Sequence, residues 1–305
     1  MSFFRIITAT VLAALMPLTS FAIGKKDGIS TTEAAIAPVV VVSILPQACF
    51  VERIAGGRVK PMVLVGPGQS PHAYEPTPRQ MAELSSAPLW LTIGVDFEKA
   101  LKPKIASLYP KLAIVDTTVG IRYRRLEAHY HEGEAEEAGH AEESGSDQHV
   151  WLGRQAAMAM AGNIRDTLSR YDPAGSSTYS RNHDAFVKDI NAAFDSLKTE
   201  LAPLDGKPVF VYHPSFGYFL DEFGIEQEAV ETGGKEPTQK NLSALIAEAR
   251  ADGARIIFVQ PQFPANAAKT VADAIGGVVV EIDALAPDWL DNIRRIGEAL
   301  KRAIR

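Results

Sequence analysis

Three histidines and one aspartate of this chain lie where a bound metal ion is expected: His72, His149, His213 and Asp283. Each of them directly follows or lies shortly after a predicted strand, except His149, which opens a predicted helix. In parallel α/β sheets, ligands bind beyond the carboxyl ends of the strands. Three imidazole nitrogens and one carboxylate oxygen form a tetrahedral donor set that suits Zn²⁺.

Each of these residues also has a less specific explanation. A lone histidine at a strand end is more often a surface or packing residue than a metal ligand. Asp283 can simply cap the helix that follows it. The prediction of a metal site therefore depends on the convergence of all four residues, two from each half of the chain, on one rim of the fold.

The elements that position these residues alternate between strand and helix. In the first half, strands are expected at 39–45, 59–65, 89–93 and 112–115, and helices at 47–56, 79–86, 97–108 and 150–171. In the second half, strands are expected at 209–212, 225–230, 255–259 and 278–282, and helices at 216–223, 239–251, 265–275 and 288–302. This alternation predicts an α/β protein with parallel sheets that are covered on both faces.

Residues 173–204, between the two halves, carry no strand signal. Apolar residues recur there at spacings of three and four, which predicts one long amphipathic helix: Phe186, Ile190, Ala193, Phe194, Leu197 and Leu201. We expect this helix to connect an N-terminal lobe, residues 38–172, to a C-terminal lobe, residues 205–305. The fold class expected is two α/β lobes joined by one long backbone helix, with the metal site in the cleft between the lobes.

Composition and charge exclude several classes of protein. The chain has 305 residues, of which 46% are hydrophobic and 22% charged, and its formal net charge is −6. These values are typical of a soluble globular protein and argue against binding to nucleic acid, which requires clustered positive charge. A single cysteine excludes an intrachain disulfide framework and a cysteine-rich zinc finger.

The first 22 residues have the pattern of a secretory signal peptide. Arg5 supplies the positive charge, a short apolar run follows, and Ser20 and Ala22 place small side chains before the cleavage point. A membrane anchor is the alternative, but the apolar run is shorter than the roughly 20 residues that a spanning helix needs. We expect cleavage after residue 22, a flexible leader at 23–37, and export to a bacterial periplasm.

Residues 127–148 carry the acidity of the chain. This segment holds eight acidic residues and three histidines, without Lys or Arg. One interpretation is a solvated insertion without a function. The other is a weak secondary zinc site, in which His129 and His131 chelate together and His140 reaches over.

Four short segments resemble those of the metal-specific solute-binding proteins of bacterial ABC transporters, the zinc/manganese group: SPHAYEPTP, QHVWL, YHPSFGYF and EIDALA. The resemblance covers about residues 38–305. It implies two α/β lobes bridged by a long helix, with the metal between the lobes. Carried over position by position, it places the family's metal ligands on His72, His149, His213 and Asp283.

The third of these ligand positions bears on the metal. Zinc proteins of the group are similar to this chain in having His there, whereas manganese proteins carry Glu, and Mn²⁺ prefers more oxygen ligands. The resemblance implies a high-affinity periplasmic carrier that delivers Zn²⁺ to an inner-membrane ABC permease. We expect it to be a monomer without catalytic residues.

Two departures from the family pattern keep alternatives open. Gln148 stands before the second histidine, where the family often has Pro. In some zinc members the aspartate does not coordinate, and water or a loop glutamate completes the shell. A manganese or iron carrier of the same family is the main alternative. A zinc-dependent hydrolase is another, but the chain lacks HExxH or a comparable catalytic motif.

Overall fold

The computed structural model describes residues 37–126, 145–231 and 237–304. The predicted signal peptide, the leader as far as residue 36 and all three histidines of the acidic segment lie outside these ranges. Residues from 37 onward form one compact unit. Among the described residues, no helix combines the length and the apolar character that crossing a membrane requires.

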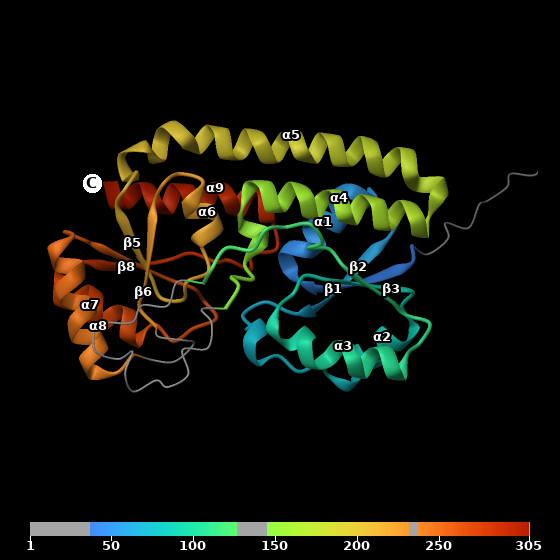
Figure 1. Ribbon diagram of the computed structural model, residues 1–305, viewed down its shortest axis with the longest axis horizontal. Coiled ribbons are helices and arrows are strands. Elements are labelled where there is room, and N and C mark those ends of the chain that lie inside the picture. Colours follow the sequence, from blue (N-terminus) through green and yellow to red (C-terminus); the bar gives the residue numbers. More distant parts are fainter. Residues whose placement is uncertain (1–36, 127–144, 232–236, 305) are drawn as a thin grey trace, which may run out of the picture. The chain divides into compact units, whose positions relative to one another are not determined.

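The first half of the chain forms a parallel sheet of four strands in the order β2-β1-β3-β4. Its strands are β1 (Val39–Ile44), β2 (Lys60–Val65), β3 (Leu89–Thr92) and β4 (Ala113–Asp116). Its helices are α1 (Leu45–Ala55), α2 (Pro78–Ser86), α3 (Asp96–Leu108) and α4 (Arg154–Tyr171). Figure 1 shows α1 and α4 on one face of this sheet and α2 and α3 on the other.

The second half forms another parallel sheet of four strands in the order β6-β5-β7-β8. Its strands are β5 (Pro208–Val211), β6 (Glu226–Ala229), β7 (Ile256–Val259) and β8 (Val278–Glu281). Its helices are α6 (Gly217–Asp221), α7 (Gln239–Ala251), α8 (Asn266–Ile275) and α9 (Trp289–Leu300). His72 follows the carboxyl end of β2, and His213 follows that of β5. In parallel sheets, ligands bind at the loops beyond these ends of the strands.

One long helix, α5 (Ser176–Leu201), packs against α1 and α4 of the first half and against α9 of the second. Its buried stripe joins an aromatic cluster: the ring centroid of Phe186 lies 5.0 Å from that of Phe50 in α1 and 6.0 Å from that of Trp289 in α9. A single cluster of buried side chains extends from β1 through these helices to β5. Packing on α5 therefore ties the two sheets to one core.

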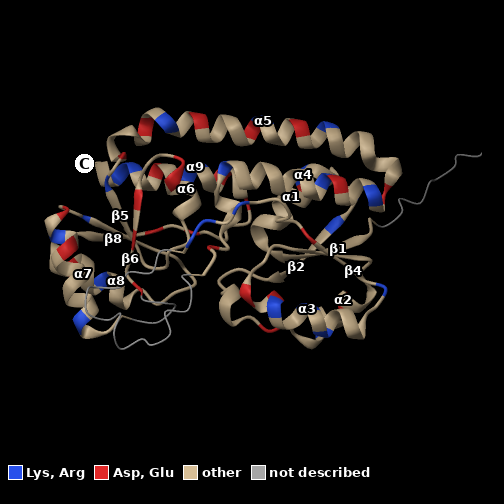
Figure 2. Ribbon diagram, in the orientation of Figure 1, with Lys and Arg blue, Asp and Glu red and all other residues tan. Residues whose placement is uncertain are grey.

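Alternation along β5 shows how the second sheet is buried on both faces. Val209 and Val211 belong to the core shared with α5, whereas Phe210 and Tyr212 belong to a separate cluster with α7 and α8. Successive side chains of a strand point to opposite faces, so one apolar run supplies both cores. Acidic and basic residues are mixed along α4, α5 and α9, away from these cores (Figure 2).

The predicted fold class is confirmed: two parallel α/β sheets and one long helix. Predicted elements agree with the observed ones except at their ends. The helix expected at 150–171 is a 3₁₀ turn at Val150–Leu152 followed by α4. Gly153 separates them in extended backbone, and a Cβ there would lie 2.9 Å from Cβ of Tyr218. This close approach of α6 leaves no room for a side chain at position 153.

Candidate metal site

Turns and side-chain hydrogen bonds fix the backbone at or beside each of the three histidines. His72 lies in a 3₁₀ turn, Pro71–Ala73, and its backbone N–H donates to the hydroxyl of Ser70 at 3.3 Å. His149 precedes the 3₁₀ turn Val150–Leu152. His213 follows β5, and its backbone is held on both sides by the amide of Gln260, at 3.2 Å to the N–H and 2.6 Å to the carbonyl.

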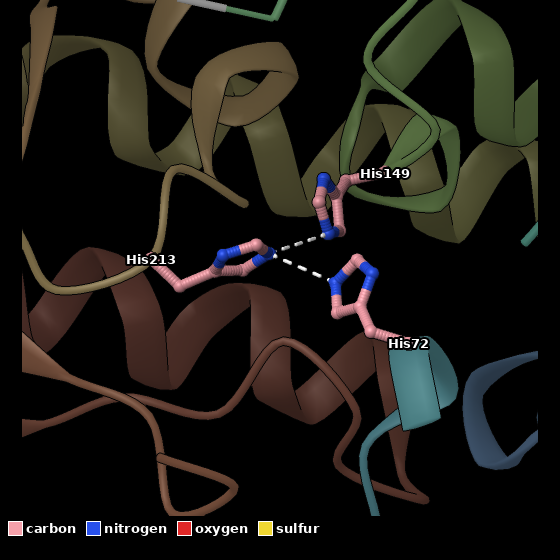
Figure 3. A group of neighbouring side chains, drawn as sticks. All are labelled: His72, His149 and His213. Atoms are coloured by element: carbon pink, nitrogen blue, oxygen red, sulfur yellow. Dashed lines mark hydrogen bonds between the residues drawn. The ribbon is translucent and has the colours of Figure 1, made fainter. Parts of the chain in front are cut away.

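The three imidazoles point toward one another (Figure 3). Nε2 of His213 lies 3.2 Å from Nε2 of His72 and 3.3 Å from Nε2 of His149. One nitrogen from each ring can be chosen so that all three lie within 4.8 Å of one another. Residues that are up to 141 positions apart in the chain therefore present nitrogens to one small volume.

The opposite nitrogen of every ring contacts a carboxylate. Nδ1 of His72, His149 and His213 lies 2.7 Å from an oxygen of Asp96, Asp147 and Glu231, respectively. In a neutral imidazole one nitrogen carries the proton and the other a lone pair. A carboxylate at Nδ1 selects the tautomer protonated there, so the lone pairs of all three Nε2 atoms face one another. Such lone pairs repel unless a cation lies between them.

Burial differs among the three rings. The side chain of His72 is 40% exposed, whereas that of His213 is only 7% exposed. Burial lowers the pKa of His213 below its usual value, although the hydrogen bond with Glu231 opposes this. Phe263 stacks on the ring of His213 with centroids 4.7 Å apart, and Trp151 contacts His149. The imidazole nitrogens thus meet between apolar walls.

Two of the carboxylates are shifted toward the ionised form. The hydrogen bond from His72 holds the pKa of Asp96 well below its usual range, helped by Lys99. Burial raises the pKa of Asp147, but hydrogen bonds and charge from His149 and Arg124 outweigh this effect and the pKa is lowered. Both groups therefore remain acceptors for Nδ1–H at neutral pH.

The structure brings together three of the four predicted ligands. Within the described residues, Asp283 is not a member of the group of close ligand atoms. Its Oδ1 instead accepts hydrogen bonds from Nε2 of Gln262 at 2.9 Å and from the backbone N–H of Leu285 at 2.8 Å. The cavity at the three histidines measures about 30 Å³, and Gln262 and Leu285 line it with Gln148. The same three histidines also border a wider hollow of about 490 Å³, which Asp96, Lys99 and Tyr123 line among the described residues.

Sequence reasoning missed Asp96, Asp147 and Glu231. Only Asp147 carried a local signal, because it lies two residues before a predicted ligand. Asp96 begins α3 and Glu231 follows β6, and their hydrogen bonds to histidine span 24 and 18 residues. His129, His131 and His140 of the predicted secondary site lie outside the described residues.

A family model described as zinc-uptake complex component A, periplasmic, matches residues 40–303. The chain belongs to this family. The predicted resemblance to a zinc-specific solute-binding protein is confirmed by this match. Members of this family are components of a zinc-uptake complex and not enzymes.

Relatives from several bacteria share the name high-affinity zinc uptake system protein ZnuA. The protein of Paracoccus denitrificans is 28% identical over 250 residues, which cover 72% of this chain and 75% of the relative. The protein of Brucella abortus is 26% identical over 301 residues, which cover 86% of this chain and 90% of the relative.

Solved structures agree with this family assignment. A crystal structure of ZnuA superposes with a TM-score of 0.80 at 30% identity, covering 88% of this chain and all of the other. A zinc-bound ZnuA that lacks residues 138–173 of its own chain gives a TM-score of 0.78 at 30% identity, covering 88% of this chain and 98% of the other. The laminin-binding protein of Streptococcus agalactiae has the same fold, with a TM-score of 0.75 at 19% identity, covering 88% of this chain and all of the other.

Proposed function

We propose that this chain is a periplasmic carrier that binds Zn²⁺ with high affinity and delivers it to an inner-membrane ABC permease. One observation carries the proposal: three Nε2 lone pairs converge while a carboxylate holds each Nδ1. Zinc sites in proteins commonly pair a ligating histidine with a carboxylate in this way. The relatives named for zinc uptake support the same conclusion.

His72, His149 and His213 are proposed as zinc ligands, and they leave one tetrahedral position for an oxygen. Asp283 remains the predicted residue for that position, with water or a loop glutamate as the alternatives. All of these oxygen donors are compatible with a carrier. An Asp283→Asn variant shows whether Asp283 coordinates, because loss of a directly bound carboxylate weakens zinc affinity strongly, whereas a site completed by water or glutamate keeps most of it.

The donor set favours zinc over the manganese alternative, because nitrogen-rich tetrahedral sites suit Zn²⁺ and oxygen-rich sites suit Mn²⁺. A hydrolase would need a carboxylate free to act as general base beside the metal. Asp96, Asp147 and Glu231 are each engaged by an imidazole Nδ1 instead. The described site therefore fits capture and release of an ion better than hydrolysis.

Thermal unfolding with Zn²⁺ and with Mn²⁺ tests the proposal. A ligand at a thousandfold excess over its Kd stabilises the folded state by about 4 kcal/mol. At roughly 2–4 °C per kcal/mol for a chain of this size, the Tm rises by about 8–16 °C. We expect this rise with Zn²⁺ and a much smaller one with Mn²⁺; equal rises would reject the zinc assignment.

A matched pair of variants locates the binding site. His213→Gln removes a proposed ligand, whereas His183→Gln alters a histidine on α5 whose Nδ1 contacts Asp184 at 3.0 Å. We expect the first variant to lose most of the zinc-induced rise in Tm and the second to keep it. The reverse outcome would place the zinc elsewhere.

The secondary zinc site on His129, His131 and His140 stays a proposal, and the structure sharpens its test. A deletion of 127–148 would remove Asp147, which holds His149. A deletion of 127–144 leaves Asp147 in place. Its two ends can be joined directly, because the backbone N–H of Leu126 donates to the carbonyl of Gly145 at 2.9 Å. Calorimetry on this shorter deletion should show the loss of one weak zinc site; unchanged stoichiometry would dispose of the secondary site.

A further inference from the structure

Arg124 joins carboxylates that belong to opposite halves of the chain. Its Nη1 donates to Oδ2 of Asp147 at 3.1 Å. Its Nε and Nη2 donate to the two oxygens of Asp221 in α6, at 2.9 and 3.2 Å. The two-pronged pair with Asp221 restricts how the guanidinium can turn, and the Arg124 side chain is only 14% exposed.

Asp147 passes this contact on to a proposed zinc ligand. Oδ2 of Asp147 faces Arg124. Oδ1 of Asp147 accepts a hydrogen bond from the backbone N–H of His149 at 2.9 Å and lies 2.7 Å from Nδ1 of the His149 ring. The side chain of Asp147 is fully buried. A buried carboxylate needs its charge compensated, so Arg124 and His149 together determine where it lies.

Helix α6 is shaped to receive Arg124. The hydroxyl of Tyr218 donates to the backbone carbonyl of Asp147 at 3.0 Å, and the hydroxyl oxygen of Tyr218 accepts from the backbone N–H of Arg124 at 3.0 Å. A Cβ on Gly217 would lie 1.7 Å from Nη1 of Arg124, so any side chain there would displace the guanidinium. Three nearby residues of one short helix thus accommodate a single arginine: Gly217, Tyr218 and Asp221.

We propose that Arg124 is a positioning residue of the zinc site, acting through Asp147 on His149. The inference rests on the proposed function. Helix α6 begins four residues after His213, so the contact also ties the segment that carries His149 to the segment that carries His213. Arg124 thereby maintains the short separation between two Nε2 atoms that come from different halves of the chain.

Arg124→Gln tests this role, and Arg154→Gln is its control. Arg154 of α4 pairs with Glu222, which directly follows α6, at 3.3 Å and with Asp195 of α5 at 2.8 Å, but it contacts no residue of the histidine cluster in the described structure. Zinc affinity is measured by competition with a chelator. We expect a loss of about 10–100-fold for Arg124→Gln, as is typical for residues that orient metal ligands, and less than about twofold for Arg154→Gln.

A second readout does not depend on zinc. Nitrogen NMR of the metal-free protein reports the tautomer of His149, and we expect the Nδ1-protonated form to lose population in Arg124→Gln but not in Arg154→Gln. Arg124→Lys restores a charge beside Asp147 and should recover part of the affinity. If Arg124→Gln does not fold, Gly217→Ala displaces the guanidinium without removing it and should give the same two changes.

Wild-type affinity together with a wild-type tautomer in Arg124→Gln would overturn the inference. So would equal losses of affinity in Arg124→Gln and Arg154→Gln, because the contact would then be structural only. Failure of the wild-type protein to bind zinc would instead reject the proposed function. The tautomer of the metal-free protein would still report whether Arg124 positions His149.

Discussion

Glu231→Gln and Asp96→Asn make the same chemical change in two different environments. Each replaces a carboxylate that contacts Nδ1 of a histidine at 2.7 Å by a neutral amide of nearly the same shape. The side chain of Glu231 is 4% exposed, and that of Asp96 is 41% exposed and also paired with Lys99. Both variants remove one negative charge beside a histidine, so a difference between their zinc affinities reports the effect of burial.

The expected magnitudes follow from the dielectric environment. Loss of a carboxylate that orients a metal ligand costs about 10–100-fold in affinity, which is about 1.4–2.7 kcal/mol. An interaction at an effective dielectric constant near 20 is about four times stronger than the same interaction in water. If Glu231→Gln costs about 100-fold, the water-screened Asp96→Asn should cost about a quarter of that free energy, roughly threefold in affinity.

Chelator competition at neutral pH and low salt measures both zinc affinities, and circular dichroism establishes that both variants are folded. We expect Glu231→Gln to weaken zinc binding by at least about tenfold, and to weaken it more than Asp96→Asn does. An equal or larger loss in Asp96→Asn would refute the argument from burial. Wild-type affinity in Glu231→Gln would refute the role of the carboxylate itself.

Three further predictions test the site and the core. His213→Glu should narrow or reverse the preference for Zn²⁺ over Mn²⁺ in thermal shift, because an oxygen replaces a nitrogen donor. The pKa of His213 is lowered in the folded state, so the unfolded state binds more protons just below pH 6.5. The metal-free protein should therefore lose stability on acidification from pH 6.5, by up to about 1.4 kcal/mol per pH unit, and urea titrations of His213→Gln should show a flatter dependence. Phe186→Ala should lower the free energy of unfolding in urea by about 3–5 kcal/mol, since the ring is buried among aromatic neighbours, and should leave the metal preference unchanged.

Local patterns in the sequence were sufficient for the elements and for three histidines. Apolar spacings of three and four predict α5, and β-branched runs predict the strands, because these periodicities arise within a single element. His72 and His213 follow strands whose neighbours pair in parallel, so the carboxyl edge of each sheet positions them. The third histidine, His149, follows no strand; it was a candidate because it opens a predicted helix, and its segment's likeness to the family then supported it as a ligand.

What surrounds the histidines was decided by tertiary structure. Asp283 follows β8 as predicted, and its carboxylate accepts hydrogen bonds from Gln262 and Leu285. Arg124 reaches Asp221 across 97 residues of sequence. The contact of Asp283 with Leu285 is local, whereas those of Asp283 with Gln262 and of Arg124 with Asp221 join distant segments and leave no trace in local spacing. Sequence periodicity therefore determined which elements form and which edges carry His72 and His213. Folding within each half decided that Asp96 and Glu231 reach these rings, and the packing of the two halves decided which arginine supports Asp147.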